Sequence, residues 1–112
     1  MTFKIFFQQR KNYNNLRKFI LKYYRHIKFR KVYRTRAKDG YEGIDKNYFL
    51  GDFVFYYSAN FDSEAWGYGV KKLEDDLNGG VIRLTVNLTY GQSRDLFKLI
   101  EKKEKIKNEF NF

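Results

Sequence analysis

The apolar side chains after Asn12 recur at intervals of three and four residues, which is the spacing of one face of an α-helix. This apolar face consists of Leu16, Phe19, Ile20, Tyr23, Tyr24 and Ile27. Asn12 is the most natural N-cap for such a helix. The opposite face is basic and carries Arg17, Lys18, Lys22, Arg25 and Lys28. The pattern predicts an amphipathic helix that begins near Asn12 and gives way to another structure near His26.

Two segments that flank this helix alternate with a period of two, which is the pattern of a half-buried strand. In the first, Phe3, Ile5 and Phe7 alternate with other side chains, so a strand is expected over 3–7. The second begins at Ile27 and continues to Arg36. One face of this second strand is largely apolar, and the other is basic and consists of Lys28, Arg30, Val32, Arg34 and Arg36.

The centre of the chain predicts a second long strand over 48–57, interrupted by Gly51 and Asp52. We interpret this pair as a bulge within one strand, and a tight hairpin between two short strands is the alternative. Both faces of Phe53–Tyr57 are apolar or aromatic, which suits a central position in a sheet. The remaining predictions here are turns at 38–40 and 78–80, one helical turn at 62–66 and a short strand at 68–73.

The last third of the chain predicts a strand over 81–88 and then a helix. Alternation in the strand directs Ile82, Leu84, Val86 and Leu88 towards the core. Thr89 and Gln92 have the spacing of a capping box, so the helix is expected to begin there and to run to about Lys107. The side chains that this helix is expected to bury are Leu96, Phe97, Leu99, Ile100, Ile106 and Phe110.

These elements predict an α+β fold in the order β-α-β-β-(β)-β-α. The fold class that fits this order is a two-layer sandwich: a mostly antiparallel sheet with two amphipathic helices on one of its faces. A chain of 112 residues is expected to form one compact domain, 1–112. The residues expected to share its core are Leu16, Phe19, Ile20, Tyr23, Leu84, Val86, Leu96 and Ile100.

Charge is distributed unevenly along the chain. The first 38 residues contain thirteen lysines and arginines and no Asp or Glu, whereas the other residues contain ten bases and all thirteen acids. A phosphate-bearing partner explains this exclusion of carboxylates, because each carboxylate near the contact would repel it. The abundance of Tyr, Phe and Lys and the absence of Pro are typical of an AT-rich genome, such as that of a phage or another mobile element.

The open face of the predicted sheet offers a surface for nucleic acid. Arginine planes beside exposed aromatic rings bind phosphates and stack on unpaired bases. The central strand would expose either Tyr56 or the pair Phe53 and Phe55, depending on its register. We therefore expect a non-enzymatic protein that binds RNA or single-stranded DNA through Arg17, Lys18, Lys22, Arg25, Lys28, Arg30, Arg34, Arg36, Tyr56 and Arg83.

Catalysis, metal binding and cofactor binding are not expected. His26 has the basic neighbours Arg25, Lys28 and Arg30, which would favour a neutral imidazole and a general base, but no acid–base partner for it can be identified. Glu74, Asp75 and Asp76 could together hold a hard cation, but adjacent carboxylates on a turn are usually only solvated. The chain also lacks a glycine-rich phosphate loop, because Gly67-Tyr68-Gly69 has neither a third glycine nor a following helix.

The chain is expected to act inside the cell, in the cytoplasm, and away from membranes. It contains no Cys, its first apolar run is too short for a signal peptide, and no window is long enough to span a bilayer. The segment 76–88, with the Lys- and Glu-rich helix after it, resembles small anti-CRISPR inhibitors of Gram-positive phages. This resemblance implies an alternative function: an inhibitor or accessory protein that docks its basic face on a host nucleoprotein enzyme.

Overall fold

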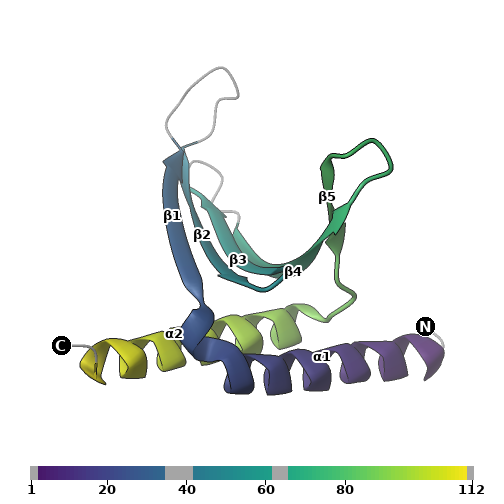
Figure 1. The fold of residues 1–112 in the computed structure, drawn as a ribbon, viewed down its shortest axis with the longest axis horizontal. Helices are drawn as coiled ribbons and strands as arrows, with labels where there is room; N and C mark the ends of the chain where they lie inside the picture. Colours follow the sequence, from purple (N-terminus) through teal and green to yellow (C-terminus); the bar gives the residue numbers. More distant parts are fainter. Residues whose placement is uncertain (1–2, 35–41, 62–65, 111–112) are drawn as a thin grey trace.

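The computed structural model describes residues 3–34, 42–61 and 66–110, apart from the side chains of residues 3, 34, 66 and 106–110. The fold is α+β, with five antiparallel strands in one open sheet and two long helices (Figure 1). The helices are α1 (Phe3–Tyr23) and α2 (Tyr90–Phe110), and a short 3-10 helix, η1 (Tyr24–His26), follows α1. The strands are β1 (Lys28–Arg34), β2 (Gly43–Leu50), β3 (Phe53–Asn60), β4 (Trp66–Asp75) and β5 (Val81–Thr85).

The sheet is a meander, in which the spatial order β1-β2-β3-β4-β5 is the same as the order along the chain. It is strongly curved, so that β1 and β5 rise on opposite sides while the middle strands form the floor between them (Figure 1). Both helices lie beneath the convex side and run in the same direction (Figure 1). No helix of the described residues lies on the concave side (Figure 1).

The core fills the space between the helices and the convex side of the middle strands. Alternation places Phe55 and Val70 on that side, and both are fully buried against Ile20 of α1 and against Leu96 and Ile100 of α2. The rest of the buried cluster is Leu16, Ile27, Tyr48, Leu50 and Phe97. Burial of the Tyr48 hydroxyl, with Glu101 and Glu104 nearby, raises the pKa of Tyr48 to about 12.

The predicted strand at 3–7 is wrong, because α1 begins at Phe3 and continues unbroken to Tyr23. A run of five residues is too short for its alternation to exclude a helix, and no Gly or Pro separates it from the amphipathic helix. Asn12 is therefore not an N-cap. Its Nδ2 donates to the backbone oxygen of Asn87 at 3.0 Å, and its Oδ1 accepts from Gln8.

The pair Gly51 and Asp52 forms the tight hairpin turn that was the alternative, and the bulge is wrong. Leu50 pairs directly with Phe53 across it, so β2 and β3 are two separate strands. Gly51 has φ +57°, a conformation that favours glycine, and the Phe19 ring packs against it from α1. The hairpin therefore turns the chain at the point where α1 supports the sheet.

The predicted strand 81–88 is shorter, and the apolar side chains of its first half are not covered by the core. β5 ends at Thr85, and Ile82 and Leu84 are exposed, because this edge of the sheet curves away from the helices. Val86 and Leu88, beyond the strand, do pack against the core. The predicted burial of Leu84 is thus wrong, as is that of Tyr23, which lies exposed at the end of α1.

The capping box before α2 is confirmed. The Thr89 N–H donates to Gln92 Oε1 at 2.9 Å, and the Gln92 N–H donates to Thr89 Oγ1 at 3.1 Å. The helix then continues to Phe110, slightly further than predicted. The predicted turn at 38–40, the first four residues of the predicted helical turn at 62–66 and the side chains of Ile106 and Phe110 lie outside the described residues. The fifth residue of that helical turn, Trp66, begins β4.

Candidate nucleic-acid interface

The concave side of the sheet forms a trough. β1 is one wall of this trough, β5 is the other, and β3 and β4 form most of its floor (Figure 1). Strand register decides which side chains enter it, because every second residue of a strand points to the same side. Arg30, Asn47, Tyr56 and Gly69 occupy one such row across four strands. A neighbouring row consists of Lys28, Phe49, Val54, Lys71 and Thr85.

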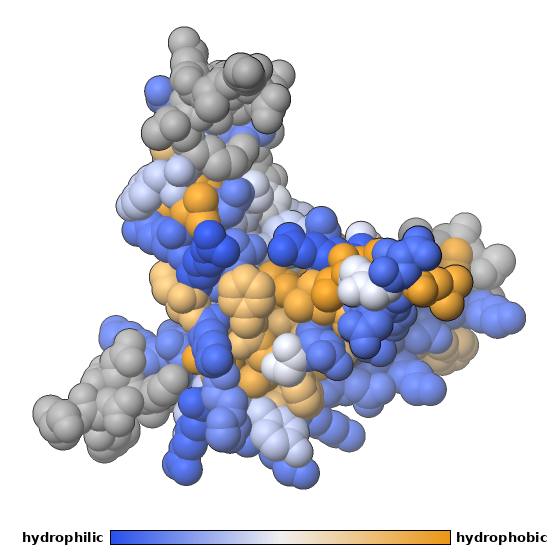
Figure 2. Space-filling model, turned by 45° about the horizontal axis from the view of Figure 1, so that its top comes forward, coloured by the Kyte–Doolittle hydropathy of each residue, from blue (hydrophilic) through white to orange (hydrophobic). Residues whose placement is uncertain are grey.

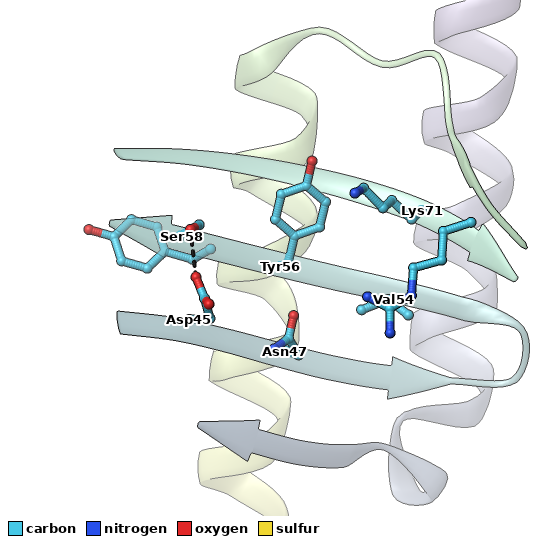
Figure 3. A pocket seen from close by; sticks show the side chains of 8 residues that line it. Asp45, Asn47, Val54, Tyr56, Ser58 and Lys71 are labelled. Atoms are coloured by element: carbon cyan, nitrogen blue, oxygen red, sulfur yellow. Dashed lines mark hydrogen bonds between the residues drawn. The ribbon is translucent and has the colours of Figure 1, made fainter. Parts of the chain in front are cut away.

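A hollow of about 270 Å³ lies in the floor of the trough. It is lined by Asp45, Asn47, Val54, Tyr56, Tyr57, Ser58, Lys71 and Arg83. Figure 3 shows this hollow from the open side of the sheet, with the helices behind the strands. The Tyr56 side chain lies across the floor from β3 towards β4, and Lys71 approaches it from the next strand (Figure 3).

The position of Tyr56 depends on Gly69, its partner on β4. A Cβ atom at Gly69 would lie 2.2 Å from the Tyr56 hydroxyl oxygen, so the outer end of the ring occupies the place of the missing side chain. The Lys71 ammonium lies 5.4 Å from the centroid of the Tyr56 ring, within the range of a cation–π interaction. The ring is therefore held against the sheet by a glycine and a cation.

Polar groups from β2 and β3 line one side of the hollow. The Ser58 hydroxyl donates to Asp45 Oδ1 at 2.5 Å, and Figure 3 shows this bond beside the Asn47 amide. These groups provide acceptors from Asp45 and both a donor and an acceptor from Asn47. The hollow thus combines an aromatic surface, a polar side and two cations.

The structure brings four of the predicted site residues to the trough. Tyr56 and Arg83 line the hollow, and Lys28 and Arg30 share its side of the sheet from the β1 wall. The question of which aromatic set is exposed is also answered, because Phe53 and Phe55 belong to the core. Arg34 occupies the β1 position opposite Gly43 on the same side, its side chain is not described, and Arg36 lies outside the described residues.

The other predicted residues lie elsewhere. Arg17, Lys18 and Lys22 are exposed on α1, which packs beneath the opposite side of the sheet from the trough. Arg25 lies between these two regions, on η1, with its guanidinium 5.7 Å from the Tyr24 ring centroid. The sequence stretch that carries no acids therefore supplies two separate basic surfaces, joined by the turn from α1 into β1.

Asp45, Asn47, Ser58 and Lys71 are polar residues of the hollow that were not among the predicted site residues. Each faces the trough because its strand pairs in the same register as Tyr56. The signal that could have identified Lys71 is the pattern Gly-x-Gly-x-Lys at 67–71, which places two glycines and a base on one side of a strand. Its link to Tyr56 depends on strand pairing, which a single sequence does not give.

The residues weighed for catalysis and metal binding lie away from the hollow. His26 is exposed on η1, with its ring 6.5 Å from that of Tyr23. Asp76 has a structural contact, because its carboxylate accepts from the Asn78 N–H in the turn before β5. Within residues 3–34, 42–61 and 66–110, no group of three or more His, Cys, Asp or Glu side chains is placed to hold a metal ion.

Exposed apolar side chains gather on a different part of the surface. In Figure 2, hydrophobic residues collect on the right of the molecule, where β5 and the start of α1 lie. The exposed apolar side chains of these two elements are Ile5, Phe6 and Phe7 on α1 and Val81, Ile82 and Leu84 on β5, and we call this set the apolar end. Phe7 is 66% exposed and lies among Arg10, Lys11 and Lys18. No described helix is long and apolar enough to cross a membrane.

No family model, curated protein or solved structure matches this chain.

Proposed function

We propose that this protein binds single-stranded nucleic acid, RNA or DNA, in the trough on the concave side of its sheet. The observation that carries this proposal is the uncovered aromatic and basic surface around Tyr56, with Lys71 and Arg83 at the hollow and Lys28 and Arg30 on the wall. Sheets that bind unpaired strands use the same combination of stacking rings and phosphate-binding cations.

The charges of the trough support an anionic ligand. Its described side chains include the four bases Lys28, Arg30, Lys71 and Arg83, against the carboxylates Asp45 and Asp75 at register positions on the same side. The Asp45 carboxylate accepts a hydrogen bond from Ser58, and Asp75 lies at the end of β4. Bases therefore outnumber acids on this side of the sheet, with Lys71 and Arg83 at the hollow and Lys28 and Arg30 on the β1 wall, and this balance favours a phosphate backbone.

The basic face of α1 is expected to contact the bound nucleic acid less directly than the trough does. Because α1 packs on the other side of the sheet, one short oligonucleotide cannot contact Tyr56 and Lys18 together without passing around an edge. The turn at Arg25 joins the two surfaces along the β1 edge. In this proposal the trough supplies the main contact, and α1 adds long-range attraction that salt screens.

The test compares two variants that lose the same charge. One replaces the trough bases, Arg30→Gln, Lys71→Gln and Arg83→Gln, and the other replaces the helix bases, Arg17→Gln, Lys18→Gln and Lys22→Gln. Fluorescence anisotropy with labelled single-stranded RNA and DNA, over a range of salt, measures the affinity of each. For wild type, four phosphate contacts predict a slope of log affinity against log salt of about −3.

The trough variant should lose affinity on the order of tenfold or more and should flatten the salt slope by about 2, since each single-strand contact releases roughly 0.7 counterions. The helix variant should retain most of both. Equal losses in the two variants would mean that net charge, and not the trough, determines binding. The absence of any binding at low salt would overturn the proposal.

The apolar end favours a second candidate, a protein that docks on a host nucleoprotein enzyme. Phe6, Phe7 and Ile82 are the kind of exposed apolar side chains that mark protein contacts. The two functions respond differently to nuclease in a pull-down. Partners held through nucleic acid should be lost after digestion, whereas an enzyme bound through the apolar end should remain.

A further inference from the structure

We infer that the hollow in the trough is a slot for one unpaired nucleotide of a bound strand, whose base stacks on Tyr56 while its phosphate lies near Lys71 and Arg83. This inference rests on the proposed function and specifies it. It specifies that the ligand unit is one nucleotide, that its base stacks on the Tyr56 ring, and that the nucleic acid is single-stranded at that point.

Two glycines of β4 leave the trough side of this strand without side chains beside the slot. Gly69 and Gly67 lie on the trough side, opposite Tyr56 and Ser58 respectively. The Tyr56 ring covers Gly69, but a Cβ atom at Gly67 would meet nothing within 4 Å. The floor therefore has a filled half, which is an aromatic platform, and an open half beside it.

The size and lining of the slot suit one base. Its volume of about 270 Å³ is below the range of roughly 300–1,000 Å³ that is usual for whole cofactors and drug-sized ligands. One side offers the Asn47 amide and the hydrogen-bonded pair of Ser58 and Asp45, which are polar partners for the edge of a base. An apolar ligand of the same size would take water from these polar groups without offering them a hydrogen bond.

A base within a duplex cannot reach this surface, because both of its faces are stacked and its pairing edge is occupied. A base of a single strand can lie on Tyr56 with its flanking phosphates over the two cations. A free mononucleotide has the same chemistry but lacks the contacts of the neighbouring phosphates with Lys28 and Arg30. The slot is therefore expected to prefer a nucleotide within a strand.

The test uses a single-stranded oligonucleotide that carries one 2-aminopurine, whose fluorescence is quenched when it stacks. Wild type should bind it and quench it, and Tyr56→Phe should do the same. Tyr56→Leu should lose the quenching and about fivefold or more in affinity, as expected for one lost stacked base. Gly67→Leu adds a bulky side chain on the trough side opposite Ser58, which lines the slot, without changing charge, and it should also lose both.

Tyr33→Leu is the matched control, because Tyr33 is an exposed aromatic residue of β1 on the other side of the sheet. It should bind and quench as wild type does, and circular dichroism should show every variant to be folded. Quenching that survives in folded Tyr56→Leu and Gly67→Leu would overturn the slot, even if the trough-base variant still weakens binding and so supports the proposed function.

Two further ligands test whether the slot binds a nucleotide of a single strand, of a duplex or free in solution. A duplex of the same sequence should bind at least about tenfold more weakly than the single strand, and equal binding would overturn the slot. Free adenosine or guanosine monophosphate should compete only at far higher concentration than the strand. Competition at equal concentration would overturn the preference for a strand.

Discussion

Tyr56 and Gly69 form a unit in which neither residue can change independently of the other. The ring lies where a side chain at 69 would be, so the absence of that side chain keeps the ring against the floor of the trough. A glycine within a strand usually weakens it, because it contributes no packing. Here the neighbouring tyrosine provides that packing and the aromatic surface at once.

Gly69→Ala should therefore lower the free energy of unfolding by about 1–3 kcal/mol, the usual cost of an overpacked contact. Gly67→Ala is the matched control, because its Cβ atom would enter open space, and its effect should be within about 0.5 kcal/mol. Urea unfolding measures both. In a Tyr56→Ala background the cost of Gly69→Ala should disappear, and its persistence there would show that the ring is not the cause.

For single residues, the sequence predicts the chemistry of a side chain better than the side of the sheet to which it points. Arg30 and Arg83 were predicted on the open side because each stands in a strand with clear alternation. Tyr56 was left open because both faces of its strand are aromatic, and only pairing with β2 and β4 shows that Phe55 is the buried neighbour. Lys71 was missed because its position beside Tyr56 also depends on the pairing of β3 with β4.

Among the elements, α1 is unusual because its inner face changes from apolar to polar towards its start. Leu16 and Ile20 are buried in the core, but one turn or more earlier Gln9 and Asn12 use their amides to bind Asn87. The sequence pattern could not extend the helix over these residues, because amphipathic periodicity counts apolar positions. The chain after β5 is thereby tied to the first half of α1.

The capping box provides a prediction for α2. Thr89→Ala should lower the free energy of unfolding by about 1 kcal/mol, because the Gln92 N–H at the first turn loses its acceptor. Thr89→Ser keeps the hydroxyl and should remain close to wild type in thermal unfolding. If serine destabilised as much as alanine, the methyl group and not the hydrogen bond would be responsible.

The capping box, the amphipathic part of α1 and the presence of a strand after it were all predictable, since each depends on local sequence. The hairpin turn at Gly51 and the exposure of the apolar side chains of β5 were not predictable. A glycine and an aspartate fit a bulge as well as a hairpin, and the burial of a strand depends on how far the helices extend across the sheet.

For the whole molecule, the curvature of the sheet separates buried from exposed leucines. Leu96→Ala should cost about 2–5 kcal/mol, because this side chain is fully buried between α2 and the sheet. Leu84→Ala should cost less than about 1 kcal/mol, because Leu84 is 44% exposed on the β5 wall. Chemical denaturation compares the two identical substitutions, and similar costs would mean that β5 is covered in solution.

The same curvature divides the basic third of the chain between two surfaces. The sequence shows that residues 1–38 exclude acids, and the predicted site groups bases of α1 with bases of β1. In the structure, α1 and β1 are consecutive in the chain but lie on different sides of the sheet. A linear charge pattern could not show this separation, because it arises from the turn at η1 and from packing with α2.

The meander has a consequence for how the chain folds. Every strand pairs only with strands adjacent in sequence, so the sheet can form by closing short loops, which is the fast route to β structure. α1 is different, because its contacts with Asn87 and α2 join the two ends of the chain. We expect the hairpins and α2 to assemble first and α1 to dock last. Until α1 docks, the apolar convex side of the sheet is only half covered, and this interval is when newly made chains are most prone to associate.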